Sequence, residues 1–340
     1  MSPEPQDRRG ILAGGNFITD YVKVIEAWPE QDTLASIRSE TMSNGGGPYN
    51  ILKNLAAMVP GLPLEACGLV GEDSNGDWIL EDCRAADIDV SQMHRTAEAS
   101  TSYTDAMTVA STGRRTFFHQ RGANALLSPA HFDFSKSNAR IFMLGYLTLL
   151  DLLDGVDEDG ITGAAMVLRR AREAGMLTAV DCVSAPNGAF KQVVFSALAQ
   201  ADLLFLNELE IGQVIGRDVP AERAAMEEAA LELASQAVHE GRQVIVHAAS
   251  GAVVAMRDGT VVSHPAVNLP ATEVAGATGA GDAFASGYLL GVHEGREAKE
   301  CLRHAACAAA MSLRDPTPSG GMRALQACLE LGDRHGWRDF

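Results

Sequence analysis

The sequence predicts an α/β fold built on a mostly parallel sheet, with a small separate β-sheet beside it. Short β-rich runs alternate with amphipathic helical patterns, as they do in successive βαβ units. Two stretches, residues 21–42 and 100–120, instead alternate polar and apolar residues with a period of two. With 340 residues, of which 46% are hydrophobic, the chain has enough apolar mass for a full-sized core. We therefore expect a single domain over residues 1–340.

Six short apolar runs are expected to form the parallel strands, at 11–13, 64–69, 140–144, 176–181, 202–206 and 243–247. Between them, Leu, Met and Val recur at three- and four-residue steps, which predicts helices over 77–86, 161–174, 221–239 and 281–293. The period-two stretches predict antiparallel hairpins, with a turn at Ser111-Thr112-Gly113-Arg114. We assign residues of about 17–44 and 98–122 to a β lid, whose exposed edge favours pairing into a homodimer.

The charge balance limits the classes of partner. The formal net charge is −17, whereas binding to nucleic acid or to an anionic membrane needs clustered Lys and Arg. The longest apolar run, residues 141–150, is far below the roughly 18 residues of a membrane span. The six cysteines form no CxxC pair, which favours reduced, packed thiols. We expect a cytoplasmic enzyme acting on a small molecule, with no nucleic acid or membrane partner.

The most informative segment is Val274-Ala275-Gly276-Ala277-Thr278-Gly279-Ala280-Gly281-Asp282-Ala283-Phe284, which leads into a helical pattern. Small residues at a helix start let a ligand approach the backbone, and the free N–H groups there attract negative charge. Asp282 would repel a phosphate in such a cradle, so it suggests a proton acceptor for an attacking hydroxyl. Equally, Asp282 could do no more than stabilise the helix N-terminus. The glycine spacing fits neither a dinucleotide-binding turn nor a Walker A loop.

Two further segments carry chemistry. In Ser43-Asn44-Gly45-Gly46-Gly47-Pro48-Tyr49-Asn50, three glycines precede a helix and Asn50 can offer a donor and an acceptor to a polyol; a plain glycine turn is the alternative. The apolar run 202–206 ends in Asn207 and Glu210, at the strand end where open α/β sheets bind ligands. Their oxygens suit Mg²⁺ or its waters, although a helix cap with a first-turn acid would give the same pattern.

Together and in this order, these segments resemble the ribokinase-like (PfkB-type) carbohydrate kinase family. The resemblance rests on Gly-Gly-x-x-x-Asn at Gly45, Gly46 and Asn50, and on the stretch Cys67-Gly68-Leu69-Val70-Gly71-Glu72-Asp73-Ser74-Asn75-Gly76. It continues through Asn-x-x-Glu at Asn207 and Glu210 to Gly-Ala-Gly-Asp at 279–282, the most specific of the four motifs. It covers most of the chain.

The resemblance implies a three-layer α/β/α domain with a β lid, and an ATP-dependent kinase that phosphorylates a hydroxyl of a sugar or nucleoside with MgATP. A monovalent cation is a further cofactor compatible with this family. The implied roles are Asp282 as the catalytic base and Gly279, Ala280 and Gly281 as the anion hole. Asn207 and Glu210 are implied as magnesium and phosphate contacts, through water, and Asp20, Gly46 and Asn50 as acceptor contacts.

The chain departs from the family pattern at two places on the nucleotide side. Gly276-Ala277 replaces the usual Asp-Thr, and His247-Ala248-Ala249 with Ser250-Gly251 replaces the usual Thr-x-Gly. His247 and Gly251 are expected beside the nucleotide, although a histidine at a strand end is more often structural.

The acceptor is the least determined part of the prediction. We favour an unphosphorylated sugar, because the arginines of the lid (Arg114, Arg115 and Arg121) are typical of a solvated hairpin. A nucleoside is the alternative, since Tyr103, Phe117 and Phe118 are placed to stack on a base. A non-catalytic binding regulator is the third hypothesis, and it would have no need of Asp282.

Overall fold

The computed structural model describes residues 8–112, 114–183, 190–236 and 241–340. A nine-stranded sheet has the order β13-β12-β11-β10-β9-β8-β1-β4-β5. Its strands are β1 Ile11–Gly15, β4 Leu64–Gly71, β5 Ile88–Thr96, β8 Ile141–Leu147, β9 Leu177–Cys182, β10 Leu203–Asn207, β11 Gln243–His247, β12 Gly251–Met256 and β13 Val261–Pro265. Pairing is parallel from β5 to β11 and antiparallel for β12 and β13. The six predicted strands are therefore confirmed, and β5, β12 and β13 are additions to them.

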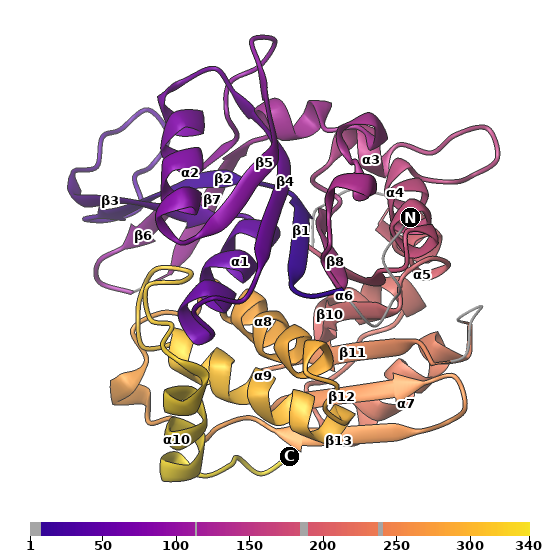
Figure 1. The fold of residues 1–340 in the computed structure, drawn as a ribbon. Coiled ribbons are helices and arrows are strands. Elements are labelled where there is room, and N and C mark those ends of the chain that lie inside the picture. Colours follow the sequence, from indigo (N-terminus) through magenta and orange to yellow (C-terminus); the bar gives the residue numbers. More distant parts are fainter. Residues whose placement is uncertain (1–7, 113, 184–189, 237–240) are drawn as a thin grey trace.

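Helices cover both faces of this sheet (Figure 1). They are α1 Gly47–Met58, α2 Ser74–Ala85, α3 Asp151–Asp154, α4 Gly163–Glu173, α5 Phe190–Leu198, α6 Glu208–Ile215, α7 Arg223–Ser235, α8 Ala280–His293, α9 Ala298–Ser312 and α10 Leu325–His335. Alternation along β1 sends Ile11 and Ala13 into the core of α1 and α8, and Leu12 into the core of α4 and α7. One core lies on each face of the sheet, between the sheet and its covering helices, so the fold has the three α/β/α layers that the sequence predicts. The end of the predicted helix 221–239 lies outside the described residues.

The small sheet has the order β3-β2-β6-β7, with strands β2 Ile18–Ile25, β3 Ile37–Gly45, β6 Tyr103–Val109 and β7 Arg115–Gln120. The pairs β2–β3 and β6–β7 are antiparallel as predicted, but β2 and β6 pair in parallel, so the purely antiparallel assignment is wrong at the centre of the sheet. The reason is topological: between β3 and β6 the chain returns to the main sheet, and β6 leaves it in the same direction as β2. Gly113, in the predicted turn, lies outside the described residues.

Two further predictions concern the chain as a whole. Every helix in the described ranges is too short or too polar to cross a membrane. All six cysteines are buried and free of disulfides, as their scattered spacing predicts.

Candidate active site

The N-terminus of α8 opens at the meeting point of the small sheet and the main sheet. Gly279 caps it with φ +76°, and a Cβ there would lie 2.6 Å from the carbonyl oxygen of Pro318, so both the backbone conformation and the space require glycine. The amide of Ala280 makes a long 3.3 Å bond to the Ala277 carbonyl, which makes it a weaker free donor than predicted. The amide of Gly281 meets no carbonyl within the described residues. This N–H is therefore the best placed to face a ligand.

Asp282 lies in the first turn of α8 and is only 3% exposed. Tyr146 Oη donates to its Oδ1 at 2.6 Å, and Asn50 Nδ2 donates to its Oδ2 at 2.8 Å. Burial raises the pKa of Asp282 to about 6, while these two hydrogen bonds act in the opposite direction. A carboxylate with a pKa just below neutral is ionised at physiological pH and still basic enough to receive a proton.

Asn50 belongs to a chain of side-chain hydrogen bonds. Its Oδ1 accepts from Asn44 Nδ2 at 2.7 Å, and Asn44 Oδ1 accepts from Ser319 Oγ at 2.8 Å. The chain joins the end of β3, the first turn of α1, the loop after α9 and Asp282. Asn50 therefore orients the Asp282 carboxylate, a contact that sequence reasoning did not assign to it.

Asp20 reaches the same site from β2. A Cβ on Gly45 would lie 2.4 Å from its carboxyl group, so the glycine makes room for it. Burial raises the pKa of Asp20 to about 7; a hydrogen bond from Thr104 lowers it and the charge of Asp282 raises it further. Gly46, directly before α1, has φ +88°, and a Cβ on it would lie 2.3 Å from the carbonyl oxygen of Asn16. The structure thus brings together the four residues Asp20, Gly46, Asn50 and Asp282.

Two site residues escaped the sequence analysis, Tyr146 and Asp181. Tyr146 lies at the end of β8, and its ring stands where a Cβ on Gly47 would come within 2.8 Å. Asp181, near the end of β9, is 6% exposed, and its pKa lies well above the usual value because of burial and the charges of Asp282 and Glu210. The available signal was a polar residue ending a buried parallel strand, the same signal that pointed to Asn207.

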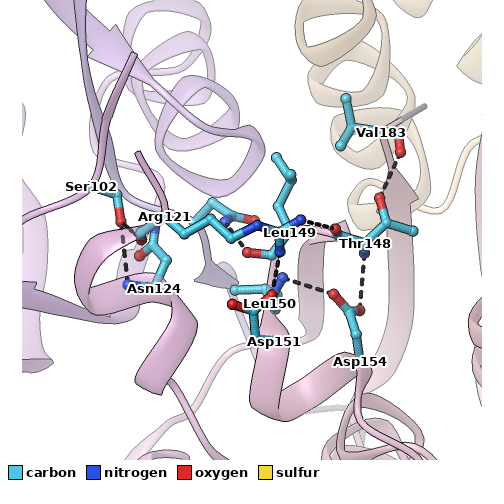
Figure 2. Close-up of polar contacts among 10 residues, drawn as sticks. Ser102, Arg121, Asn124, Thr148, Leu149, Leu150, Asp151, Asp154 and Val183 are labelled. Atoms are coloured by element: carbon cyan, nitrogen blue, oxygen red, sulfur yellow. Dashed lines mark hydrogen bonds and ion pairs between the residues drawn. The ribbon is translucent and has the colours of Figure 1, made fainter. Parts of the chain in front are cut away.

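Polar contacts hold the loop after β8 and join it to the end of the small sheet (Figure 2). Thr148 holds φ +78°, and its N–H and that of Leu150 donate to the Asp154 carboxylate at 2.9 and 2.8 Å. Arg121, just after β7, donates to the Thr148 carbonyl at 3.2 Å and forms an ion pair with Asp151. Arg121 therefore ties the small sheet to this loop and is already paired.

The predicted magnesium residues form a capping box at the start of α6. Asn207 Oδ1 accepts from the amides of Leu209 and Glu210 at 2.9 and 2.8 Å, and Glu210 Oε2 accepts from the Asn207 amide at 2.8 Å. The described residues contain no group of three or more side chains that could hold a metal ion. This donor set still fits Mg²⁺ carried by a nucleotide, because Mg²⁺ usually takes one or two protein carboxylates and completes its shell with phosphates and water.

A pocket of about 520 Å³ extends from Asn207 past the start of α8. Five residues predicted on the nucleotide side line it: Asn207, His247, Gly251, Ala280 and Gly281. Buried Glu210 and the capping Gly279 are the two predicted residues that do not. The His247 ring lies 5.1 Å from that of Phe284, and burial lowers the pKa of His247 to about 4, so it is neutral at pH 7. Most of the remaining wall is alanine, which leaves a smooth apolar slot for a planar group.

Comparisons with known proteins agree with this geometry. A model of the pfkB family carbohydrate kinases matches residues 11–323. The ATP-dependent ribose-1-phosphate kinase of Halopiger xanaduensis is 29% identical over 282 residues, covering 82% of this chain and 83% of that protein. The structure of Arabidopsis thaliana ribokinase complexed with ribose and ATP has a TM-score of 0.77 at 22% identity, covering 95% of this chain and 98% of that one.

A nucleoside kinase of Methanocaldococcus jannaschii shares the fold, with a TM-score of 0.73 at 19% identity over 96% of this chain and 99% of that one. The family model spans nearly the whole chain, and both solved structures carry the same fold. The chain therefore belongs to the pfkB family of carbohydrate kinases, the kinases that phosphorylate a sugar or a nucleoside.

Proposed function

We propose that the protein transfers the γ-phosphoryl group of MgATP to a hydroxyl of a small unphosphorylated sugar. The observation that carries the proposal is Asp282, a buried carboxylate with a pKa of about 6 that is held by two donors at the start of a long helix. On one side lies the pocket of His247 and Gly281, which suits a nucleotide. On the other side lie Asp20 and Asn50, whose polar groups suit a polyol.

In the proposed reaction, Asp282 accepts the proton of the attacking hydroxyl as the new O–P bond forms and the bond to the ADP oxygen breaks. The N–H of Gly281 stabilises the charge on the transferring group. Mg²⁺, when bound with ATP, neutralises charge on the phosphates. Asn207 and Glu210 are the residues that would hold it, through water or directly.

A phosphorylated sugar is the second candidate acceptor. Arg115 is half-buried on β7 and forms no ion pair within the described residues. With Phe117 it lines a pocket of about 500 Å³ against the segment 275–279, and a Cβ on Gly276 would come within 2.9 Å of Arg115 Nη2. The glycine that departs from the family pattern therefore leaves room for an arginine beside the anion hole, and the Halopiger relative is named for a phosphorylated substrate.

The nucleoside alternative finds less support. Register places Asp20 opposite Thr104, so Tyr103 points to the other face of the small sheet, where its ring meets Tyr21 at 6.2 Å. Phe118 is on that same face and stacks on Trp28 at 6.0 Å. Only Phe117 of the three aromatic residues faces the loop of the anion hole.

The experiment is a screen for ADP release with MgATP over free sugars, sugar phosphates and nucleosides, with Asp282→Asn as the matched background. A free sugar that raises ADP release in the wild type alone supports the proposal. A preference for a sugar phosphate over free sugars would support the second candidate acceptor instead. ATP binding without any productive acceptor would favour the regulator hypothesis.

We also propose that the small sheet mediates a homodimer in the cytoplasm. The small sheet and its β2–β3 loop expose six large apolar side chains, among them Leu34 of the loop at 89% and Ile37 of β3 at 53%. A second copy would cover this surface and the β3 edge. The six free thiols support a reducing compartment.

A further inference from the structure

A second pocket, of about 370 Å³, lies between α10 and the loop that joins α9 to α10. Three arginines line it: Arg314 and Arg323 from the loop, and Arg334 from the last turn of α10. Two carboxylates, Asp315 and Glu330, share the lining. Such a gathering of cations is unexpected in a chain whose formal net charge is −17.

The partners of these groups show which charges are available. Asp315 Oδ1 accepts from the amide and hydroxyl of Thr317 at 2.8 and 2.6 Å, and Glu330 accepts from Gln326 at 3.1 Å. Within the described residues, neither carboxylate forms an ion pair with an arginine of the pocket. The two lining acids therefore make no direct ion pair with the three guanidinium groups, and among the described residues only Glu273, on Arg314, pairs with any of them.

The arginines themselves differ in how far they are engaged. Arg314 pairs through Nε with Glu273 at 3.3 Å, outside the pocket lining. Arg323 uses Nη1 for the carbonyls of Gly320 and Met322, at 2.9 and 2.7 Å. Arg334 has no hydrogen-bond or ion-pair partner among the residues described. Each guanidinium has five N–H donors, so all three retain donors for a further ligand.

From this arrangement we infer that the pocket binds a small phosphate-bearing anion, separately from the nucleotide and the acceptor. Arginine forks match phosphate oxygens in pairs, and three of them around one cavity favour a compact multivalent anion over a single carboxylate. The cavity volume accommodates inorganic phosphate, pyrophosphate or the phosphate end of a metabolite. The site lies outside the groups assigned to phosphoryl transfer.

The same loop touches the candidate active site with its other side. The Leu313 carbonyl accepts from the amides of Ala275 and Gly276 at 2.8 and 3.2 Å, and Ser319 donates to Asn44 in the chain that ends on Asp282. Figure 1 shows this loop between the yellow helix α10 and the small sheet. An anion that orders the loop therefore acts on the segment that carries the anion hole, and this consequence alone rests on the proposed function.

Thermal unfolding at constant ionic strength tests the site without turnover. Inorganic phosphate, pyrophosphate and glucose 6-phosphate are each compared with chloride on the wild type, Arg334→Gln, Arg323→Gln/Arg334→Gln and Arg217→Gln. Arg217 is the matched control, because it is an exposed arginine paired with Glu228 and Glu232. The single Arg334→Gln variant is included because this side chain is exposed, so its replacement should leave the fold of the loop intact.

We expect at least one of the anions to raise the Tm of the wild type and of Arg217→Gln, by roughly 2 °C at about ten times its Kd. The rise should shrink in Arg334→Gln and vanish in the double variant, while the order of the three anions identifies the ligand size. Equal rises in all four proteins would place the anion elsewhere and overturn the inference, and so would no rise in any. A missing kinase activity would leave this result untouched.

Discussion

Asn50 Nδ2 donates a hydrogen bond of 2.8 Å to Oδ2 of Asp282, joining two residues that lie 232 positions apart in the sequence. With the Tyr146 hydroxyl on Oδ1, it fixes both oxygens of a carboxylate that is 3% exposed. Burial and these donors act on its pKa in opposite directions. The protonation of Asp282 is therefore set by neighbours that can be changed one at a time.

Removing one of the two hydrogen-bond donors should destabilise the ionised form of Asp282. Tyr146→Phe deletes one charge-assisted hydrogen bond, so the pKa of Asp282 should rise and the acid limb of the kcat profile should move to higher pH, by about one to two units. The rate at the alkaline plateau should change little. A pH profile that matches the wild type would show that Tyr146 is only a packing group.

Replacing Asp20 should act on acceptor binding and not on the titration of Asp282. Burial raises the pKa of Asp20 to about 7, above that of Asp282, so Asp20 is largely uncharged where Asp282 titrates, and Asp20→Asn should leave the acid limb of the kcat profile close to that of the wild type. KM for the acceptor should rise, because a polar contact is lost. Asp105→Asn is the control, since register with Tyr21 puts Asp105 on the other face of the small sheet, where it pairs with Lys23. Equal effects of the two variants would contradict the assignment of Asp20.

Glu210→Gln tests the magnesium proposal without removing the helix cap. Glutamine serves in a capping box as glutamate does, so the Tm should stay close to that of the wild type. The Mg²⁺ concentration for half-maximal rate should rise several-fold, because a carboxylate ligand is lost. Glu300→Gln removes an acid from the first turn of α9, outside the lining of the nucleotide pocket, and should leave the magnesium titration unchanged. An unaltered titration in Glu210→Gln would return this residue to capping alone.

Asp282 should also cost stability. Its folded-state pKa of about 6 exceeds the unfolded value of 3.8, so the cost is fully present above about pH 6 and disappears below 3.8. At pH 7.5, Asp282→Asn should therefore unfold at a higher temperature than the wild type, because its free energy of unfolding is larger by up to about 3 kcal/mol. Near pH 3.5 the two proteins should unfold at the same temperature. A role limited to the helix dipole predicts the reverse sign at neutral pH, with a loss of about 0.3–1 kcal/mol.

The parts of the fold that follow from local pattern were predictable. Buried runs such as 243–247 and the glycine-rich start of α8 carry their signal in neighbouring residues. Strand β5 was missed because it is an edge strand with four of its nine residues exposed, and β12 because its apolar run lacks flanking helices. The roles of Tyr146 and Asn50 depend on contacts between distant segments, which no local pattern encodes. For Asn207 and Glu210 the local pattern was visible but ambiguous, since the same residues can form a helix cap or contact a metal ion.

The central claim is that Asp282 is the general base of a phosphoryl transfer, and kcat of Asp282→Asn tests it most directly. Measured with the best acceptor of the screen at saturating MgATP, kcat should fall by about 10² to 10⁴, while nucleotide affinity stays level or improves. A kcat near that of the wild type, in a variant that still binds the nucleotide, would contradict the account.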